Sequence, residues 1–214
     1  LRYFGDGWQI SKLLDGRRYW RVPTMDGEFL CEETFGTVKG VAGGNFLILA
    51  ESAEVLRAKP GVIVVRHRLG YVMAQAGVDR SNVGGLERVL LLPESPDESA
   101  ARLRATLAGL TGVAPGVVIS DSFGRPWRLG TTNVALGAAG VPSLWNRRGE
   151  RDRNGRPLES SEVAWADAVA AAAGLVMGEA DEGLPCVLVR GLRWNAPDVP
   201  ALDLVRPIGE DLFR

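Results

Sequence analysis

The pattern of apolar and polar positions in the first half of the chain predicts short strands and one helix. Residues 1–45 are rich in Gly and aromatic residues without a clear period, so we expect only short strands and turns there. The run LILAESAEVL, residues 47–56, has the propensity of a helix, and Pro60-Gly61 predicts its end. A β-hairpin should follow, with its strands at residues 62–65 and 71–74.

The clearest helix signals in the chain lie between Ser95 and Gly112. Ser95 can cap the helix, Pro96 suits the first helical position, and Glu98 completes a capping box three residues after the cap. Gly112 is placed to end the helix. Leu103, Leu107 and Leu110 fall on one face of the predicted helix. We interpret this helix as structural.

The remaining apolar runs predict three strands and a second long helix. The strands are expected at residues 89–92, 117–119 and 185–190, the last two buried. SSEVAWADAVAAAAGLVM should form a helix of roughly five turns that starts at Ser160 or Ser161 and ends at Gly178. The tail should be irregular, with a short helix. Strands and helices alternate only in the second half, which favours an α+β fold with mixed, largely antiparallel sheets and helices packed on them.

Composition and charge exclude several classes of protein. The 214 residues are 46% hydrophobic and 24% charged, as is ordinary for a globular protein, and the net charge of −1 gives no reason to expect nucleic acid or a membrane as partner. Cys31 and Cys186 are far apart and belong to no C-x-x-C pair, so a zinc site is not indicated and a cytoplasmic location fits. There is also no P-loop and no strand–G-x-G-x-x-G–helix unit.

Three clusters that contain acidic residues lie at the ends or turns of apolar segments. The clusters are Asp79, Asp121 with the neighbouring Ser122, and Glu179 with Asp181. Oxygen ligands without a matching His or Cys favour Mg²⁺ or Mn²⁺ over zinc, and magnesium commonly shares phosphate oxygens. The pattern therefore indicates a reaction at a nucleotide phosphate, with Asn82 as a ligand contact, although each Asp alone could equally cap a turn or form a salt bridge.

Two further features have a plain and a functional interpretation. The segment Trp145–Arg156 carries five Arg, which could be a solvated loop or a cradle for an anionic substrate, because Glu150 and Asp152 do not balance them. His67 is the only histidine and has no evident partner for a catalytic triad. We interpret His67 as structural, so nucleophilic hydrolysis is not expected.

Several motifs together resemble the coenzyme F420-0:L-glutamate ligase family, also called F420 gamma-glutamyl ligases. The resemblance rests on GVDRSN, SDSFGRPWR and GERDRNGR, and on AESAEVLRAKPGVIVV, MGEADEG, CVLVRGL and the ending DLVRPIGEDLFR. It covers roughly residues 47–214 in the right order. The motifs are specific because they recur as a set.

The resemblance implies a GTP- and metal-dependent ligase of F420 biosynthesis that adds L-glutamate to coenzyme F420-0 through an acyl phosphate. It implies Mg²⁺ or Mn²⁺, allows for a monovalent cation, and implies a homodimer without nucleic-acid or membrane partners. Residues 1–214 would form one family unit, which could hold two intertwined subdomains.

The resemblance also implies roles for residues of this sequence. Asp79 and Asp121 would be catalytic, and both would ligate metal together with Ser122 and Glu179. The nucleotide would contact Ser11, Lys12, Asn82, Met177, Gly178, Glu179, Ala180 and Asp181. Arg125, Arg128, Arg147, Arg148 and Arg151 are the candidates for binding substrate carboxylates and phosphodiester.

The N-terminal part departs from the family pattern. Gln9-Ile10-Ser11-Lys12 is only a faint match to a family motif, and residues 18–46 do not match, so we expect residues 1–46 to be divergent or truncated. Two alternatives therefore stay open beside the ligase. One is a non-catalytic paralogue that binds a nucleotide or an F420-like ligand, and the other is a related ligase with a different acceptor.

Overall fold

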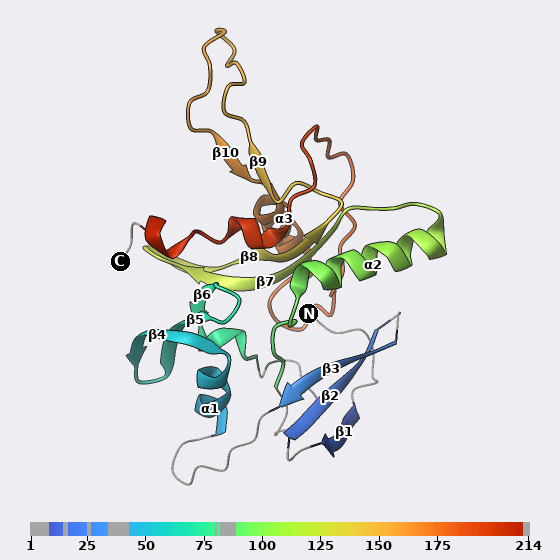
Figure 1. The fold of residues 1–214 in the computed structure, drawn as a ribbon, viewed down its shortest axis with the longest axis vertical. Helices are drawn as coiled ribbons and strands as arrows, with labels where there is room; N and C mark the ends of the chain where they lie inside the picture. Colours follow the sequence, from blue (N-terminus) through green and yellow to red (C-terminus); the bar gives the residue numbers. More distant parts are fainter. Residues whose placement is uncertain are drawn as a thin grey trace. The chain divides into compact units, whose positions relative to one another are not determined.

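The computed structural model describes residues 9–14, 17–24, 27–33, 43–79, 81 and 89–211, with side chains from residue 47 onward. Within these residues it is an α+β structure of helices and antiparallel sheets, as predicted (Figure 1). The chain divides into two compact units. The first comprises residues 1–94 and 123–130, and the second comprises residues 95–122 and 131–214.

The first unit contains two antiparallel three-stranded sheets. One is the meander of β1 (Gln9–Leu14), β2 (Arg17–Thr24) and β3 (Gly27–Glu33), which confirms the short strands expected before residue 46. The other is formed by β4 (Ser52–Lys59), β5 (Val62–His67) and β6 (Val72–Ala74). The pairing of β5 with β6 confirms the predicted hairpin.

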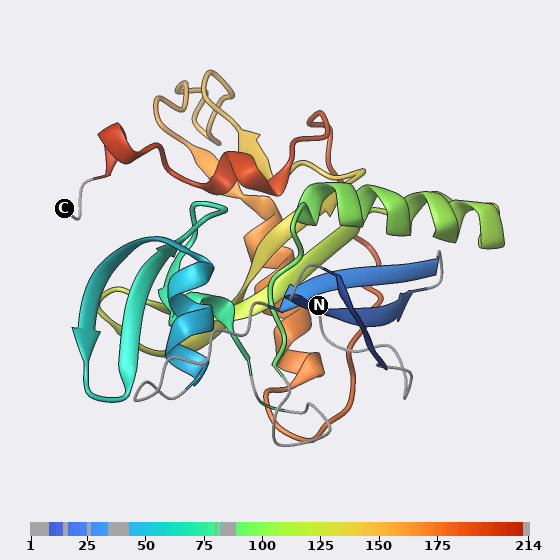
Figure 2. The same cartoon turned by 60° about the horizontal axis from the view of Figure 1, so that its bottom comes forward.

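Helix α1 (Gly43–Ala50) lies beside β4 and β5 in the first unit (Figure 2). Ile48, Val65 and Ala76 form a small core there, with Ala76 in the 3₁₀ turn η1 (Gln75–Gly77). The predicted helix over residues 47–56 is wrong beyond Ala50, because the chain turns at Glu51 and continues as β4. Pairing with β5 outweighs the helix propensity of this run, and Pro60-Gly61 forms the turn between β4 and β5 instead of ending a helix.

In the second unit, helix α2 (Pro96–Thr111) confirms the strongest local prediction. Pro96 is at its start, and Gly112 ends it in the left-handed conformation with φ 72°. The capping box is not formed, because the Ser95 side chain makes no capping hydrogen bond. Leu110, which was predicted on the apolar face of this helix, is 64% exposed, so that face is not buried along its whole length.

The strands β7 (Val117–Arg125) and β8 (Arg128–Ala139) pair in a ribbon that α2 adjoins. The strand predicted at residues 117–119 is therefore longer than expected, and it includes Asp121 and Ser122 instead of ending before them. β8 is almost fully buried from Ala135 to Ala138. Its Gly137 has no room for a side chain, because a Cβ there would lie 2.2 Å from the carbonyl oxygen of Pro96.

The Asp97 carboxylate joins three parts of the second unit. Its Oδ1 accepts the N–H of Ala138 in β8 at 2.8 Å and the N–H of Ala201 at 2.7 Å, and its Oδ2 accepts the N–H of Leu202 at 3.3 Å. Ala201 and Leu202 belong to the 3₁₀ helix η2 (Ala201–Leu204), which is distant in sequence. One side chain in the first turn of α2 thus holds both β8 and the C-terminal segment.

Helix α3 (Trp165–Met177) is attached to β8 by the same kind of contact. The Asp167 carboxylate in its first turn accepts the N–H of Ala135 at 2.8 Å. Burial raises the pKa of Asp167, and the hydrogen bond from Ala135 opposes that rise only in part. Gly174 allows a close approach, because a Cβ there would lie 2.3 Å from Oδ1 of the buried Asn133.

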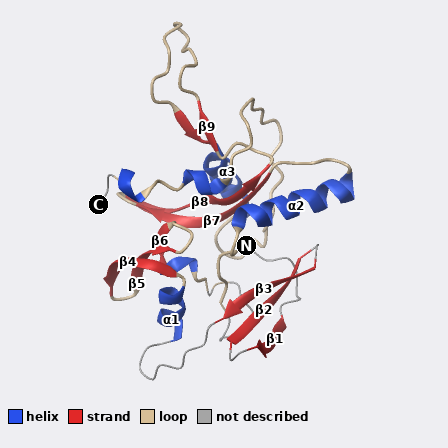
Figure 3. Ribbon diagram, viewed as in Figure 1, coloured by secondary structure: helices blue, strands red, loops and turns tan. Residues whose placement is uncertain are grey.

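α3 begins later than predicted, because residues 162–164 pair as a strand. β9 (Leu144–Asn146) and β10 (Glu162–Ala164) form an antiparallel pair, and residues 147–161 continue it as a long arm (Figure 3). Backbone hydrogen bonds connect the two sides of the arm. For example, the N–H of Gly149 donates to the carbonyl oxygen of Leu158, and the N–H of Leu158 donates to that of Glu150. The end of α3 at Gly178 is as predicted.

Two predicted strands are not formed. Leu90 makes only an isolated bridge to Asp79, and residues 185–190 belong to no strand, with Leu188 70% exposed. Where one short helix was predicted in the irregular tail, the structure has two 3₁₀ turns, η2 and η3 (Ile208–Glu210). None of the helices in the described ranges is long and apolar enough to cross a membrane.

Replacing Asp97 with Ala should lower the free energy of unfolding by about 2–4 kcal/mol, because three backbone N–H groups lose a charged acceptor. Asp97→Asn, which keeps one acceptor oxygen, should lose about half as much. The neighbouring variant Glu98→Ala is the control. The Glu98 side chain is 75% exposed and its ion pair with Arg102 is long, at 4.0 Å, so this variant should lower the free energy of unfolding by no more than about 0.5 kcal/mol. Urea unfolding curves measure all three, and equal losses for Asp97→Ala and Glu98→Ala would contradict the role of Asp97.

Candidate functional site

Strand β7 places a carboxylate on the same face as two buried apolar side chains. Ile119 and Phe123 are 8% and 9% exposed, and alternation along the strand puts Asp121 between them on that face. Oδ1 of Asp121 accepts the N–H of Ser122 at 2.8 Å. The Ser122 side chain lies on the opposite face by the same alternation. Phe123 is further held by an edge contact with Tyr71, whose ring centroid is 6.0 Å away.

The same strand ends in a guanidinium group that lacks an acceptor. Arg125 is the last residue of β7, and its Nη1 is buried without a hydrogen-bond partner among the described residues. A buried donor without an acceptor destabilises a protein by about 1–3 kcal/mol. A carboxylate or phosphate oxygen would remove that penalty, so Arg125 is suited to bind an anion. Arg128, across the turn at the start of β8, is exposed.

Asp79 lies in the first unit, in an isolated antiparallel β-bridge with Leu90. Its backbone exchanges two hydrogen bonds with Leu90, of 3.0 and 2.7 Å. Its Oδ1 accepts the N–H of Ser81 at 2.7 Å, and the Ser81 hydroxyl donates to both carboxylate oxygens. Ser81 was not among the predicted site residues, although the spacing D-x-S is typical of such a turn.

The acidic turn after α3 depends on Gly178 and Glu182. Gly178 has φ 72° and ψ −178°, a conformation essentially restricted to glycine. The Glu182 carboxylate folds onto it, because a Cβ at Gly178 would lie 2.0 Å from that group, and Oε2 accepts the N–H of Ala180 at 2.8 Å. Glu182 therefore shapes the turn that carries Glu179 and Asp181, although it is not among the predicted site residues.

The arginines predicted to bind substrate from the arm already have partners within it. Arg147 donates to Glu150 from Nε and Nη2, at 2.9 and 2.6 Å, and this pairing raises the pKa of Arg147. Arg148 donates to Glu162 at 2.8 Å, and Arg151 donates to the carbonyl oxygen of Gly155 at 2.6 Å. The carboxylates thus compensate more of the arm's positive charge than the sequence suggested.

Some predicted contacts lie outside the description of the structure. Asn82 is not among the described residues, and Ser11 and Lys12 lie in β1 without described side chains. Of the predicted metal ligands, Asp79 belongs to the first unit, whereas Asp121, Ser122 and Glu179 belong to the second. Over the described ranges, three or more His, Cys, Asp or Glu side chains do not gather into a metal-binding group. The metal ligands stay a prediction.

Comparison with known proteins identifies the family. A model of the F420-0:gamma-glutamyl ligase family matches residues 44–191. A coenzyme F420:L-glutamate ligase from Methanocaldococcus jannaschii is 44% identical over 207 residues, which cover 96% of this chain and 81% of that protein. The enzyme of that name from Methanothermobacter thermautotrophicus is 48% identical over 170 residues, 78% of this chain and 67% of that protein. The chain belongs to this family.

Membership of the F420-0:gamma-glutamyl ligase family confirms the resemblance found in the motifs and supports ligase activity in F420 biosynthesis. The family match begins at residue 44, which agrees with a divergent part before it. The Methanocaldococcus relative extends further, because an alignment over 96% of the chain includes most of that part.

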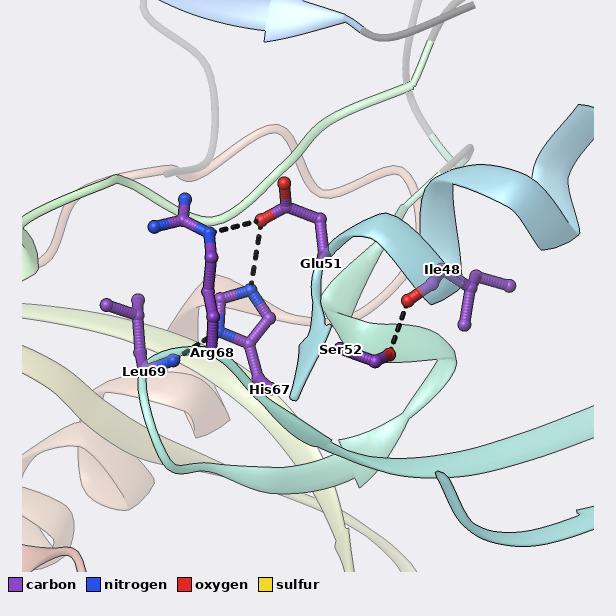
Figure 4. A network of polar contacts seen from close by, with 6 residues as sticks. All are labelled: Ile48, Glu51, Ser52, His67, Arg68 and Leu69. Atoms are coloured by element: carbon purple, nitrogen blue, oxygen red, sulfur yellow. Dashed lines mark hydrogen bonds and ion pairs between the residues drawn. The ribbon is translucent and has the colours of Figure 1, made fainter. Parts of the chain in front are cut away.

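His67 is buried and hydrogen-bonded within the first unit, which agrees with the predicted structural role, although its carboxylate partner was not evident from the sequence. The ring is fully buried at the end of β5, its Nδ1 accepts the N–H of Leu69 at 3.0 Å, and its Nε2 lies 3.2 Å from Oε2 of Glu51 (Figure 4). Because Nδ1 is an acceptor, the ring proton belongs on Nε2 and is donated to Glu51. Nε of Arg68 donates to the same oxygen at 2.9 Å. Burial favours the neutral form of Glu51, but the two donors outweigh it and lower its pKa.

Glu51→Gln should therefore lower stability in a pH-dependent way. A lowered folded-state pKa gives stability that is present above the unfolded pKa of about 4.3 and is lost as the pH falls through the folded value. We expect a deficit of about 1–3 kcal/mol at pH 7 that narrows below about pH 4. Urea unfolding at several pH values measures it. Glu54→Gln is the control, because this side chain is 46% exposed in its ion pair with Arg66. A deficit that does not change with pH would contradict the role of the Glu51 charge.

Proposed function

We propose that this protein is a GTP-dependent ligase that adds L-glutamate to coenzyme F420-0 in F420 biosynthesis. The observation that carries the proposal is the 44% identity to a coenzyme F420:L-glutamate ligase over 96% of this chain. The chemistry of β7 supports it, because Asp121 and Arg125 are suited to a reaction between anionic substrates.

The reaction needs an activated carboxylate, since an amine does not attack a carboxylate anion at a useful rate. In the proposed sequence, a carboxylate oxygen of F420-0 attacks the γ-phosphorus of GTP, which forms an acyl phosphate and releases GDP. The amine of L-glutamate then attacks the acyl carbon, loses a proton, and displaces inorganic phosphate as the amide bond forms. The protein has mainly to hold the reactants and to stabilise negative charge.

Residues of both units have proposed parts in this reaction. Asp79, Asp121 and Glu179 would hold Mg²⁺ or Mn²⁺, since carboxylate oxygens suit these hard ions. Ser122, whose side chain lies on the opposite face of β7 from Asp121, would join them through its backbone carbonyl oxygen. A bound divalent ion would neutralise the nucleotide phosphates during transfer. The proposed nucleotide contacts are Ser11, Lys12, Asn82 and the turn Met177, Gly178, Glu179, Ala180 and Asp181. A monovalent cation, a homodimer and a cytoplasmic location belong to the same proposal.

Arg125 and Arg128 are the proposed ligands of the substrate's phosphodiester and carboxylate groups. The buried Nη1 of Arg125 supports this role most directly, because it has no other acceptor among the described residues. Arg147, Arg148 and Arg151 are weaker candidates, because each already donates to an oxygen of the protein and only their remaining N–H groups could bind a substrate anion without breaking such a bond.

The ligase reaction is tested with purified protein, GTP, Mn²⁺, L-glutamate and F420-0, followed by mass spectrometry. We expect F420 with one or two added glutamyl units. GTP binding without product would instead indicate the non-catalytic paralogue, and product with a different acceptor only would indicate the related ligase.

Asp121→Asn should lower kcat about 100-fold or more with an unchanged unfolding midpoint, whereas the control Asp198→Asn, an exposed carboxylate, should keep full activity. Wild-type turnover in Asp121→Asn would remove that residue from the site.

Arg125→Met should weaken substrate binding without weakening the fold. Losing a charged hydrogen bond raises the KM for F420-0 about 10-fold or more, while removing a buried donor without a partner leaves stability equal or higher. Steady-state kinetics and urea unfolding measure the two effects, with the exposed Arg206→Gln as control. A lower stability with an unchanged KM would show that Arg125 is structural.

Charge reversal at Arg147, Arg148 and Arg151 tests the arm in the same assay. If it changes the KM for neither F420-0 nor L-glutamate, the arm does not bind substrate.

A further inference from the structure

The turn between β7 and β8 contains a tryptophan that the fold does not account for. Pro126 and Trp127 connect Arg125 to Arg128, and Trp127 has φ 63°. A turn with Pro followed by a residue of positive φ is normally completed by Gly or Asn, since a bulky side chain is strained there. The Trp127 side chain is 88% exposed, so burial does not compensate for the strain.

Strain without burial points to a role in binding. Non-glycine residues with positive φ cluster at ligand sites, where the conformation aims a side chain that the fold does not need. An exposed indole offers a flat apolar face with an N–H at its edge, which suits a planar aromatic ring. Leu129, which is 100% exposed, adds apolar surface to the same turn.

The charged residues of the turn indicate that the ligand also carries an anionic group. The segment FGRPWRLG, residues 123–130, contains two Arg and no acidic residue. One of them, Arg125, has a buried Nη1 with no acceptor among the described residues. The turn therefore combines a stacking surface with a guanidinium that needs an anionic oxygen, which fits an aromatic ring with an attached phosphodiester or carboxylate.

We propose that Trp127 stacks on the deazaflavin ring of F420-0, with Arg125 on an anionic group of the same molecule. This inference rests on the proposed function, in which two substrates, F420-0 and GTP, are aromatic anions. The turn favours F420-0, because the nearest carboxylate proposed to bind metal, Asp121, lies four residues before Arg125 along β7, roughly 13 Å at about 3.3 Å per residue, whereas a triphosphate requires the metal ion beside it. A phosphodiester or a single carboxylate is matched by arginine alone. Trp127 is thus a specificity-determining residue for the acceptor.

The test compares Trp127→Gly with Trp127→Phe in the ligase assay. Trp127→Gly removes the ring and also the backbone strain, so the KM for F420-0 should rise at least about fivefold while the unfolding midpoint stays equal or rises. Trp127→Phe keeps a ring to stack on, so its KM should stay within about threefold of wild type. The KM for GTP and for L-glutamate should not change in either variant. Leu175→Ala, an 89% exposed apolar residue on α3, is the control.

Each other outcome decides against the proposal. An unchanged KM for F420-0 in Trp127→Gly, in a wild type that does convert F420-0, overturns this inference alone and leaves the proposed function intact. A rise in the KM for GTP instead would assign the turn to guanine. A loss of activity toward all substrates with a changed oligomeric state in size-exclusion chromatography would assign it to a subunit interface. If the wild type neither binds nor converts F420-0, both proposals are wrong.

Discussion

The second unit depends on the Asp97 carboxylate, which accepts three backbone N–H groups from two distant segments. A carboxylate in the first turn of a helix is favoured there by the helix dipole. The N–H groups of the buried Ala138 and Ala201 would otherwise lack a partner away from solvent. Gly137 makes this possible, because a side chain on it would collide with Pro96 at the start of α2. The position of β8, and of β7 paired with it, follows from this contact.

The second helix repeats the arrangement on the same strand. Asp167 in the first turn of α3 accepts the N–H of Ala135, and Gly174 admits Asn133 at close range. Each helix thus contributes an Asp of its first turn to the contact with β8, and a glycine leaves room for it, Gly137 of β8 facing α2 and Gly174 of α3 facing Asn133. The ribbon that carries Asp121 is held by hydrogen bonds as well as by apolar contacts such as those of Ala135, Ala138 and Ala166. Such directional contacts suit a strand whose polar groups have to be positioned for chemistry.

The sequence predicted elements best where local signals decide the structure. Pro96 and Gly112 determine the bounds of α2 by their own backbone preferences, so the prediction was accurate there. Residues 47–56 were misread because pairing with β5, which is a tertiary effect, converts Ser52 onward into a strand. The apolar run at residues 185–190 was misread for the opposite reason, because apolarity alone does not supply a pairing partner.

The candidate site could be predicted in its residue types but not in its contacts. Asp121 and Arg125 are recognisable from their place after an apolar run. That Arg125 has a buried nitrogen without an acceptor depends on what surrounds it in three dimensions. The positive φ of Trp127 could not be predicted either, since the residue type opposes it.

The ion pairs of the arm limit what its arginines can contribute to affinity. An anion that approaches Nε and Nη2 of Arg147 competes with Glu150, and one that approaches Nη2 of Arg148 competes with Glu162, so one carboxylate partner would be exchanged for another. Such an exchange leaves the number of ion pairs nearly constant and yields little net attraction in exposed surroundings. The positive charge of Arg147 and Arg148 is thus largely compensated by Glu150 and Glu162 before any ligand arrives.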